Sequence, residues 1–183
     1  TTHLSAADQD GNMVAITTTL LSRFGSRVVL PSTGILMNNG VNWFDPRPAQ
    51  PNSLAAGVRP LSNMVPLLAL KDAAPWFAVG ASGGRRIMPC VFQIAQLLAA
   101  HGCSLEEAMA YPRFDMSTLS EITVDDRMST EQQAALAAVA PVSACAPVAF
   151  PSRFAVPQAV LRTATGVFGA AHVNSPLNGV AAV

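Results

Sequence analysis

The first twenty residues carry the strongest strand signal in this sequence. Two short runs rich in apolar and β-branched residues, His3 to Asp8 and Met13 to Leu20, lie on either side of Asp10-Gly11. Asp-Gly is typical of the tight turns that join antiparallel strands, because these turns need residues with positive φ. We therefore expect a β-hairpin here, which restricts the chain to folds that contain a sheet.

The rest of the sequence contains further strand signals and several helix signals. The expected elements are strands at Val28–Leu30 and Gly34–Asn38, a second hairpin of Pro66–Lys71 and Trp76–Ala81, helices at Ile87–Ala100, Leu105–Ala110 and Ser129–Val139, and two or three strands between Val142 and Phe168. This order favours an α+β layered sandwich. A chain of 183 residues can bury one substantial core, so we expect residues 1–183 to form a single domain.

A proline-rich segment separates the first strands from the second hairpin. Residues Asp45 to Pro66 include five prolines together with asparagine and glycine residues. Because proline fixes φ, we expect an ordered, extended loop here rather than a flexible linker. Loops of this length inside a compact domain are usually functional.

Charged residues are sparse and balanced. They make up only 12% of the chain, 11 basic and 11 acidic, whereas a typical soluble domain has about 25%. The balance gives no electrostatic reason to expect a nucleic acid or an anionic membrane as partner. No apolar stretch approaches the roughly 18 residues of a membrane span, so we expect another polypeptide to cover a large face of this chain.

The cysteine and histidine residues form no metal or disulfide pattern. Cys90, Cys103 and Cys145 are odd in number and widely spaced, and the three histidines lack metal-ligand spacing. We therefore expect buried free thiols and assign neither a metal nor another cofactor. Free thiols weakly favour a reducing compartment, so the corresponding expectation is a cytoplasmic location.

The first residue is a candidate nucleophile. A threonine hydroxyl reacts poorly unless a base takes its proton. An N-terminal residue carries its own base, an α-amino group with a pKa of about 8. The sequence begins Thr1-Thr2-His3, with no Met and no leader, and leads directly into the first strand pattern. Either a precursor is cut before Thr1, or the sequence was trimmed arbitrarily at this residue.

A glycine-rich segment lies between an expected strand and an expected helix. Gly80-Ala81-Ser82-Gly83-Gly84-Arg85-Arg86 would let backbone N–H groups approach a ligand beside a helix N-terminus. Two such groups could form an oxyanion hole for acyl transfer. A phosphate-binding loop is less favoured, because the G-x-x-x-x-G-K-[ST] pattern is missing. A tight turn without function is the remaining alternative.

Two adjacent polar residues end the proline-rich loop. Ser62 and Asn63, in Arg59-Pro60-Leu61-Ser62-Asn63-Met64, could bind a carboxylate or an amide. The alternative is a loop that these side chains hold in place through their own hydrogen bonds. Asp125-Asp126 fits a solvated turn better than a catalytic pair.

Several motifs together resemble the small subunit of the γ-glutamyltranspeptidase family. They are Thr1-Thr2-His3-Leu4-Ser5, Asp8-x-Asp10-Gly11-Asn12, Gly34-Ile35-Leu36-Met37-Asn38-Asn39, Arg59-Pro60-Leu61-Ser62-Asn63-Met64, Ser82-Gly83-Gly84 and Pro112-Arg113-Phe114. They occur in the family's order. The resemblance covers roughly residues 1 to 125 well and the tail poorly.

The resemblance implies an N-terminal-nucleophile hydrolase with a four-layer αββα sandwich. It implies a precursor that cleaves itself before Thr1, and a separate large subunit that completes the sandwich and explains the sparse charge. A dimer of such heterodimers is left open. By position, Thr1 would be nucleophile and base, Thr19 would hydrogen-bond its hydroxyl, and Gly83 and Gly84 would form the oxyanion hole. Ser62 would contact the substrate carboxylate, helped by an arginine of the large subunit.

The sequence departs from the family pattern where transpeptidases bind the α-amino group of a glutamyl donor. Leu21, Gly40 and Trp43 stand where the family has Asn, Gln and Asp. An ammonium group buried there without partners would cost several kcal/mol, so the resemblance implies a substrate without that amine. Asn63 replaces the second serine of a Ser-Ser pair, and the usual Asp-Pro-Arg is absent around Ala171-His172-Val173.

These departures predict a small acid amide as the substrate. The stretches Trp43 to Pro48 and Pro51 to Ser53 resemble the oxamate amidohydrolase branch, so the first expectation is hydrolysis of oxamate to oxalate and ammonia. The alternatives are a γ-glutamyl hydrolase or transpeptidase with a rebuilt pocket, and a cephalosporin-type acylase. A catalytically inactive binding subunit is the non-enzymatic alternative.

Overall fold

The structure is a computed structural model that describes residues 1–118, 120–149 and 153–182. The chain divides into two compact units. The first contains Thr1 and Thr18–Asn63, and the second contains Thr2–Thr17 and the chain from Met64 onward.

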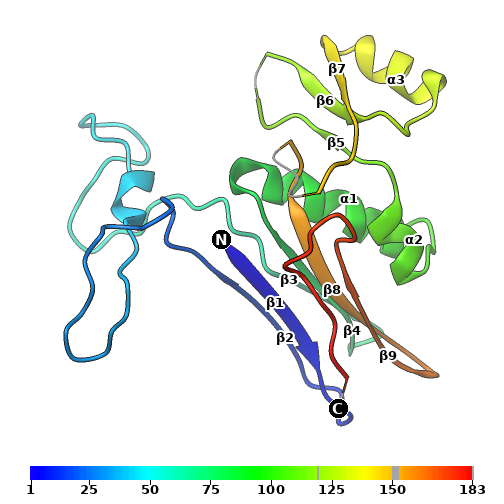
Figure 1. Cartoon of the computed structure of the whole chain (residues 1–183), viewed down its shortest axis with the longest axis horizontal. Helices are drawn as coiled ribbons and strands as arrows, with labels where there is room; N and C mark the ends of the chain where they lie inside the picture. The colour runs from blue at the N-terminus through cyan, green and yellow to red at the C-terminus, as the bar shows by residue number, and fades with distance from the viewer. Residues whose placement is uncertain (119, 150–152, 183) are drawn as a thin grey trace. The chain divides into compact units, whose positions relative to one another are not determined.

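The second unit is built on a four-stranded antiparallel sheet in the order β3-β4-β8-β9 (Figure 1). Its strands are β3 (Leu67–Lys71), β4 (Ala74–Ser82), β8 (Val156–Thr163) and β9 (Gly166–Ala171). The predicted second hairpin is confirmed as β3–β4. Its turn is Asp72-Ala73, and both residues have positive φ, 51° and 62°, as a primed two-residue turn requires.

The predicted first hairpin is confirmed as β1 (Thr2–Ala7) and β2 (Met13–Thr18). Gly11 in its turn has a φ of 89°. Strand β1 packs against β4 and β8 through side chains that alternate along the strand. His3 points toward Gly80 of β4 so closely that a Cβ on Gly80 would lie 2.2 Å from the imidazole. Two β layers therefore stack in this unit.

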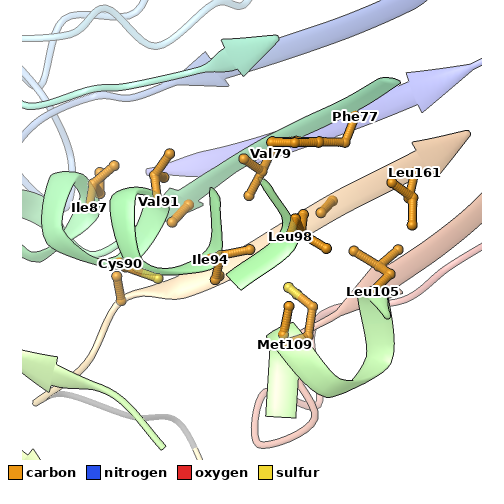
Figure 2. Close-up of a cluster of buried hydrophobic side chains, with 14 residues drawn as sticks. Phe77, Val79, Ile87, Cys90, Val91, Ile94, Leu98, Leu105, Met109 and Leu161 are labelled. Carbon is orange, nitrogen blue, oxygen red and sulfur yellow. The ribbon is translucent and has the colours of Figure 1, made fainter. Parts of the chain in front are cut away.

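Helices α1 (Ile87–Ala99) and α2 (Leu105–Ala110) bury their apolar faces on the sheet (Figure 2). Buried residues of α1 recur at helical spacing, which places them on one face. They are Ile87, Cys90, Val91, Ile94 and Leu98. This face meets alternate residues of β4, Phe77, Val79 and Ala81, while Gly80 meets β1. Strand β4 is therefore buried on both faces.

A smaller sheet follows in the second unit. It contains β5 (Phe114–Asp115), β6 (Ile122–Asp125) and β7 (Val142–Cys145), with α3 (Thr130–Ala137) between β6 and β7. Ser104 and Ser129 form capping boxes at the starts of α2 and α3. The expected two or three strands of the tail are β7, β8 and β9. Residues 150–152 of that tail lie outside the described residues.

The first unit consists mostly of loops. Its helix is a 3-10 turn, η1 (Gly40–Trp43), and the predicted proline-rich loop follows it. The strands expected at Val28–Leu30 and Gly34–Asn38 are wrong, because these segments share only an isolated bridge between Val29 and Leu36. The apolar side chains of these segments, including Val28 and Ile35, are exposed in this chain. Because β-propensity depends on packing against neighbouring strands, these segments do not form regular strands here.

None of the described helices is long and apolar enough to cross a membrane. The described residues contain no group of three metal-ligating side chains that could hold a metal ion.

Candidate active site

The Thr1 side chain contacts Thr19. The two Oγ1 atoms lie 2.9 Å apart, a hydrogen-bonding distance at which either hydroxyl could be the donor. The Leu21 N–H also donates to Thr19 Oγ1 at 3.0 Å. The Leu21 amide occupies one lone pair of Thr19 Oγ1, which leaves the second lone pair and the hydroxyl proton for the contact with Thr1. Both threonines belong to the first unit, and Thr1 is exposed.

Leu21 has a left-handed backbone, with a φ of 68°. This conformation is unfavourable for leucine and much easier for glycine or asparagine. Hydrogen bonds on either side hold it in place. Asn39 accepts from Ser22 N–H at 3.0 Å through Oδ1, and donates to Ser22 Oγ at 2.8 Å through Nδ2. Asn39 N–H donates to Leu20 O at 3.1 Å. Position 21 thus has a backbone conformation that suits asparagine, the residue of the family pattern, but carries the apolar side chain of leucine.

Gly40 and Trp43 form one local structure. Gly40 begins η1, and its N–H donates to Asn38 Oδ1 at 2.8 Å. The Trp43 ring lies over Gly40, so that a Cβ on Gly40 would be 3.1 Å from ring atom Cζ3. The half-buried indole therefore leaves little room for a larger residue at position 40. These two departures from the family pattern are coupled by packing.

Asn52 joins the two ends of the proline-rich loop. Its Nδ2 donates to Trp43 O at 2.6 Å, and its Oδ1 accepts from Leu61 N–H at 2.9 Å. The side chain thus connects the residue that carries the indole to the residue before Ser62. The sequence singled out Ser62 and Asn63 but not this connection. Only the Pro-Asn-Ser stretch hinted at it, since asparagine often bonds to nearby backbone in turns.

Gly83 and Gly84 lie in the second unit, between β4 and α1. Gly83 has a φ of 144°, and a Cβ there would lie 2.7 Å from the Ala155 Cα. Gly84 has a φ of 64° and begins a 3-10 turn, Gly84–Arg86, that leads into α1. No heavy atom lies within 4 Å of where a Gly84 Cβ would stand. Gly83 therefore has neither the φ nor the space for a side chain, and Gly84 has the space but a φ that favours glycine.

Thr1, Thr19, Leu21, Gly40, Trp43, Ser62 and Asn63 all belong to the first unit, and Gly83 and Gly84 belong to the second. The first unit brings Thr1 to Thr19, Leu21 to Thr19, and Trp43 to Gly40. Ser62 is exposed and Asn63 is half-buried.

The fold is that of the N-terminal-nucleophile hydrolases. The chain is similar to γ-glutamyltranspeptidase from Pseudomonas nitroreducens complexed with L-DON, with a TM-score of 0.80 and 27% identity over 100% of this chain and 99% of that chain. It is also similar to cephalosporin acylase from Bacillus halodurans, with a TM-score of 0.79 and 26% identity over 94% of this chain and 32% of that one.

The family model described as gamma-glutamyltranspeptidase matches residues 1–180, and the chain belongs to this family. It is 42% identical over 113 residues to the "Acylase ACY 1 proenzyme" of Pseudomonas sp. (strain SE83), covering 62% of this chain and 20% of the relative. It is 36% identical over 142 residues to the "Glutathione hydrolase proenzyme" of Escherichia coli (strain K12), covering 72% and 24%. The chain therefore spans about a quarter or less of these relatives.

Proposed function

We propose that this chain is the catalytic small subunit of an amidohydrolase with Thr1 as nucleophile. The observation that carries the proposal is the 2.9 Å contact between the Thr1 and Thr19 hydroxyls, with Leu21 N–H fixing Thr19 from its other side. A positioned neighbouring hydroxyl is what an N-terminal threonine needs to keep its oxygen aligned for attack. Residues 1–183 would form one catalytic small-subunit domain, cut from a precursor immediately before Thr1.

The reaction would proceed through an acyl-enzyme. Thr1 Oγ1 attacks the amide carbonyl while the Thr1 α-amino group takes its proton, and the Thr19 hydroxyl donates to the same oxygen. The amine of the substrate leaves with the proton from the Thr1 amine. Water then attacks the Thr1 ester, which releases the acid and restores the hydroxyl.

The Gly83 and Gly84 N–H groups would stabilise the oxyanion of each tetrahedral intermediate. Positions 83 and 84 are glycine because both have positive φ values, and because a Cβ at Gly83 would clash with Ala155. Loss of one oxyanion-hole donor typically costs about 10²–10³-fold in kcat. Ser62 and Asn63 would bind a carboxylate of the substrate.

A large subunit from the same precursor would cover this chain. The outward face of the β1–β2 hairpin exposes Leu4, Val14 and Ile16, opposite the face that packs on β4 and β8. A sheet in this fold normally buries both faces, which supports a partner layer on this side. The word "proenzyme" in the names of the relatives agrees with a processed precursor.

For the substrate, the relatives favour an acylase-type or glutathione-type amide over oxamate. They are named acylase and glutathione hydrolase, and oxamate finds no support among them. Between the two supported classes, the local geometry favours the acylase type. Leu21 and Trp43 put a leucine side chain and an indole where the resemblance implies ligands for an α-ammonium group. We propose an acyl group that lacks a free α-amino group.

Two substrates that differ only in that amine test the proposal. The precursor with its large-subunit region is expressed and matured, and p-nitroaniline release is measured from glutaryl and from γ-glutamyl p-nitroanilide. We expect kcat/KM for the glutaryl substrate to exceed that for the γ-glutamyl substrate at least tenfold, and Thr1→Ala to abolish both reactions. Equal or reversed preference would overturn the substrate class, and ammonia release from oxamate alone would restore the oxamate interpretation. Full turnover by Thr1→Ala would overturn the nucleophile.

A further inference from the structure

Arg113 is a buried arginine that forms no ion pair with the carboxylates of the described residues. It is 5% exposed, and its guanidinium donates to the Cys90 Sγ and to Ala155 O. Neither acceptor carries a negative charge. Among the described residues, no Asp or Glu oxygen lies within the 4.0 Å of an ion pair with Arg113. Burying a guanidinium is costly unless a negative group balances it.

His172 follows β9 and has an unused polar atom. The residue is 9% exposed, and its Nδ1 has no hydrogen-bond partner among the described residues. Most buried polar atoms are paired, so an unpaired imidazole nitrogen calls for an explanation such as a bound water or ion. The backbone N–H of His172 donates to Pro157 O at 3.1 Å, which holds the residue beside β8.

Arg113 and His172 line the same recess, together with Arg127 and Asp125. Both Asp125 oxygens are taken by Arg127, through Nε at 2.9 Å and through Nη2 at 2.5 Å. Asp125 therefore pairs directly with Arg127, and its charge acts on Arg113 only from beyond ion-pair distance. The described lining of the recess thus has two arginines and one carboxylate. The remaining wall is largely apolar and includes Pro147, Phe154 and Val173.

The size of the recess limits what could bind there. Its cavity volume is about 20 Å³, and one bound water needs roughly 10–15 Å³ on the same scale. We propose that this recess binds a small monovalent anion, such as chloride or formate, between Arg113 and His172. The anion would balance the buried guanidinium and accept from the His172 ring. All of its lining residues belong to the second unit, and the proposal does not depend on the proposed chemistry at Thr1.

The charges around His172 predict a signature of anion binding. Burial, with Arg113 and Arg127 nearby, lowers the His172 pKa to about 4, and Asp125 acts in the opposite direction. A further titratable side chain, that of Tyr111, also lines the recess. An anion within about 4–6 Å would favour the imidazolium, so it should raise the His172 pKa by about one unit or more.

The mature enzyme is titrated with chloride, bromide or formate at constant ionic strength, with gluconate as the replacement anion because it is too large for the recess. The His172 ring is followed by NMR, assigned by loss of its signals in His172→Gln. We expect the three small anions to raise the His172 pKa and to raise Tm by about 3 °C or more over gluconate. Arg153→Gln, at a surface arginine of the same unit, should keep both effects.

His172→Phe should lose the Tm effect, since it removes the imidazole and fills the recess. If that variant does not fold, bromide-soaked crystals of the wild-type enzyme decide, through an anomalous peak beside Arg113 and His172. No pKa change with any small anion would overturn the proposal, as would a recess without bromide. Because hydrolysis at Thr1 is measured separately, failure here leaves the proposed function standing.

Discussion

The Thr1 and Thr19 Oγ1 atoms lie 2.9 Å apart, and Leu21 N–H reaches Thr19 Oγ1 at 3.0 Å. Thr19 is thus held by backbone on one side and contacts the proposed nucleophile on the other. This arrangement assigns Thr19 a positioning role whose removal should affect the chemical step more than binding.

Replacing Thr19 by valine should lower kcat about 10- to 100-fold with little change in KM, because valine keeps the shape and removes the hydroxyl. Thr19→Ser is the matched control, since it retains the oxygen, and should keep most of the activity. Steady-state kinetics with a chromogenic amide measure both variants. A Thr19→Val enzyme with unchanged kcat would show that this hydroxyl does not assist Thr1.

Leu21→Asn should stabilise the protein by about 0.5–1 kcal/mol, because asparagine tolerates the left-handed φ of 68° better than leucine does. Urea unfolding measures the change in free energy. Leu21→Ala is the control, as alanine keeps the unfavourable backbone and loses the leucine packing, so it should not stabilise. If both variants destabilise equally, the leucine side chain contributes more than the backbone strain.

Asn52→Leu should raise KM several-fold and lower the free energy of unfolding by about 1–2 kcal/mol. Leucine has a similar shape but cannot bond to Trp43 O or Leu61 N–H, which Asn52 connects at 2.6 Å and 2.9 Å. Asn52→Asp keeps the acceptor for Leu61 N–H and should lie between the wild type and Asn52→Leu. An Asn52→Leu enzyme with normal KM would show that the loop holds Trp43 and Ser62 without this connection.

Gly80→Ala should destabilise the second unit by about 1–3 kcal/mol, because the new Cβ would lie 2.2 Å from the His3 ring. In a double-mutant cycle, His3→Ala should absorb most of that cost by making room. Gly179→Ala, where a Cβ meets no atom within 4 Å, is the matched control. Thermal unfolding of the four variants measures the coupling, and purely additive effects would contradict the close packing of β1 on β4.

The elements that the sequence predicted are those set by local chemistry. The Asp10-Gly11 turn and the spacing of apolar residues in α1 both act within a few residues. The strands expected around Val29 and Leu36 failed because strand formation needs a neighbouring strand, and propensity alone does not supply one.

The features that the sequence did not predict depend on residues outside one local turn. The close fit of His3 on Gly80 and the recess between Arg113 and His172 join distant segments, and the Asn52 side chain bonds to residues nine positions away on either side. The Thr1–Thr19 contact was expected only from the family resemblance. The left-handed backbone at Leu21 could not be read from leucine, which rarely adopts it.

Stability should fall as pH drops from about 6.5 toward 4, because of His172. Burial and the neighbouring arginines lower its pKa to about 4 from 6.5, so between these values the unfolded chain binds a proton that the folded chain does not. The free energy of unfolding therefore rises with pH across this window, by at most about 3 kcal/mol. His172→Gln should flatten the dependence. The measurement is urea unfolding from pH 4 to 7 in gluconate buffer, so that no small anion offsets the effect. An equally steep pH dependence in His172→Gln would show that another group causes the loss of stability. His3 would then be tested first, because burial also lowers its pKa.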